Sequence, residues 1–257
     1  MAARWSDLAD ELDRWAEAGR VATLWWRDDD ATAPGAKLEH LVAIAGRVPV
    51  ALAVIPAGAA PELASWLSTR PGLAVLQHGW SHSNHSANGK KSEFPPGRNR
   101  EDVELDLFAG RSRLTRLFAS RALAVLVPPW NRYDESFLPL LHGCGIRGIS
   151  QKNSRRTMSP APAVIEVNVH ADLVAWAGDR RFVGEKEALG CLVGHLAARR
   201  RGAACPDEPT GILTHHLVQD AAADSFLRRL LAMTCSHPAA RWLDACEAFA
   251  PAGFAPV

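Results

Sequence analysis

Two histidines that are separated by three residues could bind a metal ion. His78 and His82 directly follow the apolar run at residues 73–76, so they lie where a buried strand ends. Imidazole is the most common protein ligand for metals, and zinc often adds one carboxylate to its histidine ligands. A carboxylate source, Asp28-Asp29-Asp30, follows a second apolar run at residues 22–26. Two isolated histidines are more often loop residues bonded to water or backbone, but the strand end and the acidic cluster favour a metal site.

The elements that would position these residues alternate between strands and helices. Such alternation predicts a mostly parallel sheet, and about seven strands resemble a TIM-type barrel that lacks one unit. The polar stretch at 83–99 is predicted to be a surface loop beside the site. The expected strands are 22–27, 48–55, 73–77, 123–127, 146–149, 163–168 and 211–214, and the expected helices are 6–18, 36–46, 61–69, 100–119, 134–142, 184–200, 222–233 and 239–249.

Four polar clusters each follow the carboxyl end of an apolar run: residues 28–30, 78–82, 128–132 and 215–216. In a parallel barrel these ends lie on one face, where active sites are built. The alternative is that the clusters belong to four unrelated loops. Their repeated position after a strand favours a single site.

Composition excludes some classes of function. The chain has 257 residues with a net charge of +1, which gives no indication of a nucleic-acid partner. Its five cysteines form no CxxC pair, so free thiols in a reducing compartment are expected. The amino terminus lacks an apolar signal region, and no apolar run is long enough to span a membrane. We therefore expect a cytoplasmic protein without a membrane partner.

The order and spacing of the polar clusters resemble the polysaccharide deacetylase family, also called the NodB-homology or carbohydrate esterase 4 (CE4) group. The family motif TFDDG is matched to residues 26–30, and HSxxH to residues 78–82. The motif RxPYG is matched to residues 127–131, and Leu-x-His to Leu213-Thr214-His215. The resemblance covers most of the chain, from the first strand to His216.

The resemblance implies an α/β fold, a deformed (β/α)7 barrel of the NodB-homology type, as one domain over residues 1–257 with an amino-terminal helix at 6–18. It also implies one divalent metal, with Asp29, His78 and His82 as ligands. Zinc is expected first, and Co²⁺, Mn²⁺ and Ni²⁺ are alternatives. Asp28 would be the general base and His215 the general acid, because a carboxylate can accept a proton from water and an imidazole can protonate the leaving amine.

The sequence also departs from the family pattern. Val127 stands where the third motif has arginine, and Arg132 or Arg27 is a candidate replacement for that charge. Asp172 could orient His215 or be a plain surface carboxylate. Trp80 and Trp130 could line a sugar subsite or serve packing. The candidate substrate-binding residues are Trp80, Pro129, Trp130, Arg132 and Asp172.

The implied activity is removal of an acyl group, acetyl in the first instance, from an N-acetylated sugar or a related amide. The expected partner is a small or oligomeric N-acetylated carbohydrate. Two alternatives stay open at this stage. The chain could hydrolyse another non-peptide C–N bond on the same scaffold, or it could bind a carbohydrate without turnover.

Overall fold

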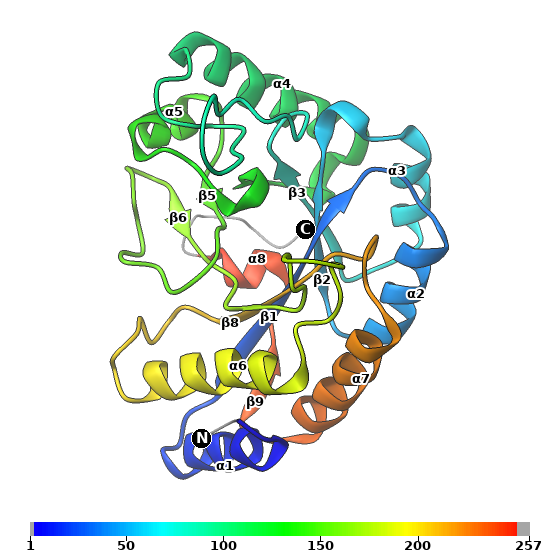
Figure 1. The fold of residues 1–257 in the computed structure, drawn as a ribbon, viewed down its shortest axis with the longest axis vertical. Helices are drawn as coiled ribbons and strands as arrows, with labels where there is room; N and C mark the ends of the chain where they lie inside the picture. Colours follow the sequence, from blue (N-terminus) through cyan, green and yellow to red (C-terminus); the bar gives the residue numbers. More distant parts are fainter. Residues whose placement is uncertain (1–2, 251–257) are drawn as a thin grey trace.

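A computed structural model describes residues 3–250 (Figure 1). The strands are β1 (Ala22–Ala31), β2 (Val50–Val54), β3 (Leu73–His78), β4 (Ala122–Val127), β5 (Gly148–Ile149), β6 (Ile165–Glu166), β7 (Ala171–Asp172), β8 (Thr210–Thr214) and β9 (Ala240–Trp242). The α-helices are α1 (Trp5–Glu17), α2 (Ala36–Ala45), α3 (Pro61–Ser68), α4 (Arg100–Phe118), α5 (Leu138–Gly143), α6 (Glu185–Arg200), α7 (Ala221–Ser236) and α8 (Ala245–Ala248). Short 3₁₀ helices are η1 (Pro56–Gly58), η2 (Ala119–Arg121), η3 (Pro129–Asn131) and η4 (Glu135–Phe137).

The sheet is parallel throughout, with the strand order β6-β5-β4-β3-β2-β1-β8-β7, and β9 pairs with β1. The seven strands expected from the sequence are all present, and β7 and β9 are additional. Within residues 3–250 no strand ladder joins β6 to β7, so the barrel is deformed and incompletely closed. The predicted fold class is therefore confirmed.

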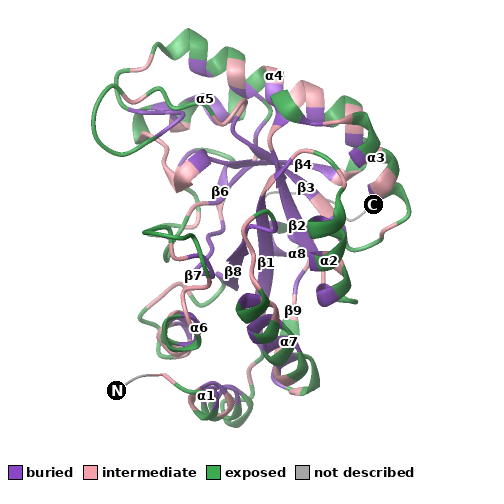
Figure 2. Cartoon of the chain, turned by 45° about the vertical axis from the view of Figure 1, so that its right-hand side comes forward, coloured by how far each residue is buried: buried purple, intermediate pink, exposed green. Residues whose placement is uncertain are grey.

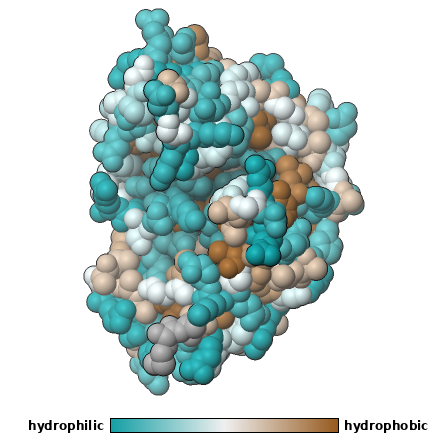
Figure 3. All heavy atoms as spheres, in the orientation of Figure 1, coloured by the Kyte–Doolittle hydropathy of each residue, from teal (hydrophilic) through white to brown (hydrophobic). Residues whose placement is uncertain are grey.

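Two apolar layers lie on opposite faces of the sheet because successive side chains of a strand alternate between its faces. Trp26 and Ile212 belong to the outer layer, which packs against the helices. Trp25 and Leu213 belong to the inner layer, inside the curled sheet. Figure 2 shows buried strands at the centre, with helices whose outer faces are exposed. The face drawn in Figure 3 is mainly hydrophilic, with smaller hydrophobic patches.

The carboxy-terminal region differs from its prediction. Residues 239–249 were expected to form one helix, but they form β9 and the four-residue helix α8. The reason is tertiary packing. Ala240 to Trp242 pair with the first residues of β1, and Phe249 packs edge-on against Trp25 with ring centroids 5.8 Å apart. This segment therefore fills part of the inner layer, and local periodicity does not encode that role.

The stretch at 83–99 is irregular, as expected, but part of it is buried. Ser92, Glu93 and Phe94 have exposed fractions of 5%, 0% and 0%. The stretch therefore contributes a packed wall beside the site as well as a surface loop. The amino-terminal helix expected at 6–18 is α1, whereas the single-domain assignment stays a prediction. Of the helices in residues 3–250, none combines the length and apolar character needed to span a membrane.

The five cysteines are unpaired in the structure. Cys144 is buried and Cys235 is exposed. We expect a thiol reagent to label Cys235 fastest in the native protein and to find five thiols after denaturation without reductant. Labelling followed by mass spectrometry checks this. An intramolecular disulfide in the purified protein would contradict it.

Candidate metal and catalytic site

The end of β1 directs consecutive side chains to opposite faces of the sheet. Trp25, Arg27 and Asp29 lie on the inner face, and Trp26 and Asp28 lie on the face toward the helices. Asp28 accepts hydrogen bonds there from the Thr214 hydroxyl and from His216. The residue expected to be the base therefore lies on the opposite face of the sheet from Asp29.

Asp30 breaks this alternation. Its backbone has a left-handed φ of 73°, and the register between β1 and β2 shifts between Asp28 and Ala31. A β-bulge of this kind re-aims a side chain. The Asp30 carboxylate consequently turns toward the histidines, with Oδ1 3.2 Å from His78 Nε2 and 3.4 Å from His82 Nε2.

Asp30, His78 and His82 form a group that could hold a metal ion. One ligand atom from each lies within 4.8 Å of the others. His78 Nδ1 lies 2.9 Å from the Val127 carbonyl oxygen, which can only accept a proton, so Nδ1 carries the hydrogen and Nε2 is free to bind a metal. His78 and His82 lie together as expected, and the carboxylate grouped with them in the structure is that of Asp30, whereas Asp29, the expected ligand, is not part of this group.

Glu93, which the sequence analysis missed, holds the loop between the two histidines. Its buried carboxylate accepts hydrogen bonds from the backbone amides of Trp80 and Ser81, at 3.2 and 2.8 Å. Gly79 has a φ of 57°, and a Cβ atom there would lie 1.9 Å from Glu93 Oε2. The close contact requires glycine and fixes the path of the chain from His78 to His82. Burial raises the pKa of Glu93, although these amide bonds oppose it. The only sequence signal was an acidic residue beside Phe94 and two prolines.

Arg27 supplies the positive charge for Asp29. Its guanidinium donates two hydrogen bonds to the Asp29 carboxylate, from Nε at 2.8 Å and from Nη2 at 3.0 Å. Arg27 also donates to the side chains of Asn131 and Ser150, at 2.6 and 2.7 Å. Both Arg27 and Asp29 are essentially inaccessible to solvent. Of the two candidate replacements for the missing arginine, Arg27 contacts Asp29, whereas Arg132 donates to the Lys91 carbonyl.

His215 faces Asp29 across the site. Its Nε2 lies 4.0 Å from Asp29 Oδ2, and its ring is in edge contact with Trp176 at 4.6 Å between centroids. Trp176 in turn donates its indole N–H to Asp172, which also lies 3.3 Å from the Lys152 ammonium. Asp172 is therefore linked to His215 through Trp176.

The other candidate substrate-binding residues surround the histidine loop. Trp130 has a left-handed φ of 57° and packs against His82, with ring centroids 4.3 Å apart. Pro129 is buried against Gly79. The half-buried Trp80 lies between the two histidines in the chain, and its carbonyl accepts a hydrogen bond from the Ala57 amide. Trp130 and Pro129 are thus packed around the group of Asp30, His78 and His82.

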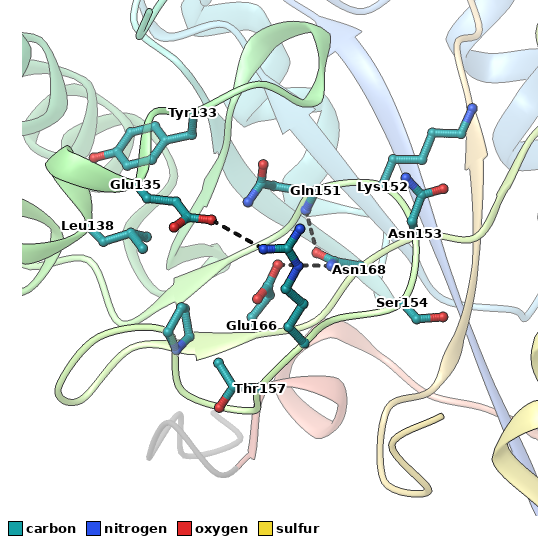
Figure 4. A pocket seen from close by; sticks show the side chains of 12 residues that line it. Tyr133, Glu135, Leu138, Gln151, Lys152, Asn153, Ser154, Thr157, Glu166 and Asn168 are labelled. Carbon is teal, nitrogen blue, oxygen red and sulfur yellow. Dashed lines mark hydrogen bonds and ion pairs between the residues drawn. The ribbon is translucent and has the colours of Figure 1, made fainter. Parts of the chain in front are cut away.

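A cavity of about 470 Å³ is lined by residues that follow β4 and β5 and by residues of β6 and the segment after it (Figure 4). Gln151 and Lys152 line it, and the Gln151 carbonyl accepts from Arg27 while Lys152 contacts Asp172. On its walls the Gln151 amide donates to Asn168, and Glu135 lies 4.0 Å from the Arg156 guanidinium. The cavity therefore carries positively and negatively charged side chains, and it is connected to Arg27 and Asp172 through Gln151 and Lys152.

The charges at the metal-binding group favour an ionised carboxylate. Burial alone would raise the pKa of Asp30, but His78, His215 and His82 outweigh it and hold that pKa far below its usual range. Burial lowers the pKa of His78, yet Asp29 and Asp30 raise it overall. Burial and the neighbouring His78 lower the pKa of His82. A carboxylate and two imidazoles in this arrangement are a donor set that zinc accepts.

A second buried group consists of His170, His195 and Glu208. The two imidazole rings stack at 3.3 Å between centroids with planes 15° apart. Because the lone pairs lie in the ring planes, two nearly parallel rings cannot direct them to one ion. In addition, the Gly211 amide donates to His170 Nδ1 at 3.0 Å, so the hydrogen of the neutral ring is on Nε2. This group does not fit a metal ion.

Comparison with known structures identifies the fold. A candidate polysaccharide deacetylase from Mycobacterium smegmatis has a TM-score of 0.60 and 15% identity, covering 91% of this chain and 90% of its own. A mutant of a CE4 pseudoenzyme with restored activity has a TM-score of 0.56 and 10% identity, covering 90% of this chain and 68% of its own. A chitin deacetylase from the fungus Colletotrichum lindemuthianum has a TM-score of 0.52 and 13% identity, covering 88% of both chains.

No model of a known protein family matches the sequence, and no curated protein matches it either. The structural similarities therefore concern the fold. The chain has the fold of the CE4 polysaccharide deacetylases, and the resemblance inferred from the motifs is confirmed at that level.

The geometry predicts which variants lose a bound metal. Asp30→Ala, and His78→Ala combined with His82→Ala, should abolish stoichiometric zinc binding because they remove the grouped ligand atoms. Asp28→Asn should retain zinc, because that side chain lies on the other face of the sheet. Elemental analysis after dialysis against zinc measures this. Full zinc content in Asp30→Ala, together with loss of zinc from Asp29→Asn, would instead support Asp29 as the ligand, as the first match to the family motif implied.

The stacked histidines predict a pH dependence of stability. Burial lowers the pKa of His195 from 6.5 to about 4, although Glu208 opposes the shift. Between pH 6.5 and about 4 the unfolded chain therefore binds a proton at His195 that the folded chain does not bind. The free energy of unfolding keeps the full contribution of the neutral ring above pH 6.5 and loses it as the pH falls toward 4. In His195→Asn the decline between these pH values should be smaller than in the parent. Urea unfolding at several pH values measures it, with the exposed His142→Asn as control. Equal declines in His195→Asn and the parent would contradict the assignment.

Proposed function

We propose that the protein is a metal-dependent hydrolase that removes an acyl group from the nitrogen of an N-acetylated sugar or a related amide. One observation carries this proposal. A group suited to one divalent ion and a facing carboxylate–imidazole pair lie together, and the two parts are joined by the consecutive residues Asp29 and Asp30.

Asp30, His78 and His82 would hold the ion. Three protein ligands leave coordination positions open, which is typical of catalytic zinc sites. When bound, a divalent ion there would polarise the substrate carbonyl and increase the acidity of a water molecule. Zinc suits one carboxylate and two imidazoles, and Co²⁺, Mn²⁺ and Ni²⁺ are alternatives.

Asp29 is assigned as the general base in place of Asp28. Its carboxylate is adjacent in the chain to the metal-binding Asp30 and is oriented by the two hydrogen bonds from Arg27. It would accept a proton from the attacking water. His215, 4.0 Å away, would donate a proton to the amine nitrogen as the C–N bond breaks. The products are a carboxylic acid and a free amine.

The substrate would lie along the polar cavity and the aromatic residues near it. Trp176 is 46% exposed although its ring contacts His215, so it offers an apolar surface at the acid. The cavity walls carry amide, hydroxyl and charged groups, a mixture that suits a sugar with many hydroxyl groups. The cytoplasmic location stays a prediction.

The test is acetate release by the zinc-loaded protein from a panel of N-acetylated monosaccharides, oligosaccharides and non-sugar amides. We expect turnover of at least one sugar. Asp29→Asn and His215→Ala should each lower kcat by about 10²–10⁴-fold, the usual range for general acid–base groups, while zinc remains bound. Asp13→Asn, an exposed carboxylate on α1, is the matched control and should match the parent.

Two results would redirect the assignment. Turnover of non-sugar amides only would favour the alternative hydrolase on this scaffold. Binding of sugars by the zinc-loaded parent, without any release of acetate, would favour the non-catalytic binder.

A further inference from the structure

A second hydrogen-bonded group joins the ends of β1 and β8 on the helix side of the sheet. Asp28 Oδ1 accepts from the Thr214 hydroxyl at 2.7 Å and from the His216 backbone amide at 3.0 Å. Asp28 Oδ2 lies 2.5 Å from His216 Nδ1. The Trp26 indole N–H donates to the same Thr214 hydroxyl at 2.8 Å. The Asp28–His216 pair thus closes a chain of polar contacts between two neighbouring strands.

This pair is directly connected to the candidate catalytic residues. Asp28 precedes Asp29 in the chain, and His216 follows His215. Asp28 and Thr214 are also partners in the parallel ladder between the two strands. A contact that fixes Asp28 relative to His216 on one face therefore fixes the backbone from which Asp29 and His215 project on the other.

His215 needs such support because little else anchors its ring. Strand β8 ends at Thr214, before the histidine. Its buried Nδ1 has no hydrogen-bond partner among residues 3–250, and the edge contact with Trp176 is apolar. The His215 carbonyl accepts a hydrogen bond from the Val218 amide at 3.0 Å, which holds the backbone but not the ring. The side chains on either side of His215, Thr214 and His216, both contact Asp28.

The contacts between Asp28 and His216 are shielded from water. Asp28 and His216 have exposed fractions of 0% and 4%, so water competes little for their polar atoms. A carboxylate and an imidazole that are buried together hold their geometry because breaking the contact would leave a buried group unpaired.

We propose that Asp28 and His216 are positioning residues that set the separation between the Asp29 carboxylate and the His215 imidazole. The inference rests on the proposed function for its catalytic consequence. The structural consequence, the 4.0 Å separation, does not depend on turnover. A misplacement of about 1 Å can lower a rate by about 10²-fold, so loss of the pair should act on kcat.

The variants are His216→Ala, which removes the ring, and His216→Asn, whose side-chain amide can still donate to Asp28. We expect His216→Ala to lower kcat by about 10- to 100-fold with KM and zinc content close to the parent. His216→Asn should recover most of the activity, because its side-chain N–H group can donate to Asp28 in place of the imidazole Nδ1. His237→Ala removes another histidine–aspartate contact, with Asp13, and is the matched control that should leave kcat unchanged.

Crystal structures of the parent and His216→Ala give a readout that does not require activity. We expect the separation between Asp29 Oδ2 and His215 Nε2 to increase in the variant. If the parent is inactive on every substrate, the proposed function fails, and this separation alone tests the positioning role. Unchanged kcat and an unchanged separation in His216→Ala would overturn the proposal. If His216→Ala does not fold, His216→Leu keeps a side chain of similar volume but removes the ring nitrogen that contacts Asp28, and an unchanged kcat and an unchanged separation there would overturn the proposal equally.

Discussion

The buried ion pair between Arg27 and Asp29 is the interaction on which the architecture of this site depends. Removing a carboxylate from water costs several kcal/mol, and a partner with good geometry must offset that cost. Arg27 does so with two hydrogen bonds to Asp29, and it is itself held by Asn131 and Ser150. The guanidinium thereby ties the end of β1 to the segments that follow β4 and β5. Removing it would leave a buried charge and loosen three segments at once.

The two faces of β1 present carboxylates with different contacts at the end of the strand. The inner face presents Asp29, and the bulge at Asp30 adds a second carboxylate to the same region. The outer face presents Asp28, which contacts the end of β8. Three identical residues thus have three environments: paired with arginine, grouped with two histidines, and hydrogen-bonded between strands. Strand alternation and one left-handed residue are sufficient to produce this division.

Much of the fold could be predicted from the sequence because apolar runs and the polar residues after them are local signals. The strand ends led to His78, His82 and His215, which lie at the site. Our proposed assignment moves the first motif by one residue, because the bulge at Asp30 arises from backbone geometry that a row of aspartates does not reveal. A one-residue displacement exchanges the faces of a strand, so the expected roles of Asp28 and Asp29 moved together.

Other features could not be predicted because they depend on distant contacts. Arg27 was only one of two candidates for the missing charge, and its contact with Asp29 decides between them. Glu93 lies in a polar stretch, yet it is buried against the backbone of Trp80 and Ser81. The helix expected at 239–249 is divided because β9 pairs with the start of β1. In each case a partner far along the chain determines the local structure.

The central claim is that Asp30, and not Asp29, completes the metal-binding group with the two histidines. The most direct test is a crystal structure of the protein grown with zinc, with anomalous data collected at the zinc edge. The account predicts one strong peak about 2.0–2.2 Å from a carboxylate oxygen of Asp30 and from the Nε2 atoms of His78 and His82. A peak that is coordinated by Asp29, or one that lies between His170, His195 and Glu208 with none at Asp30, would contradict it.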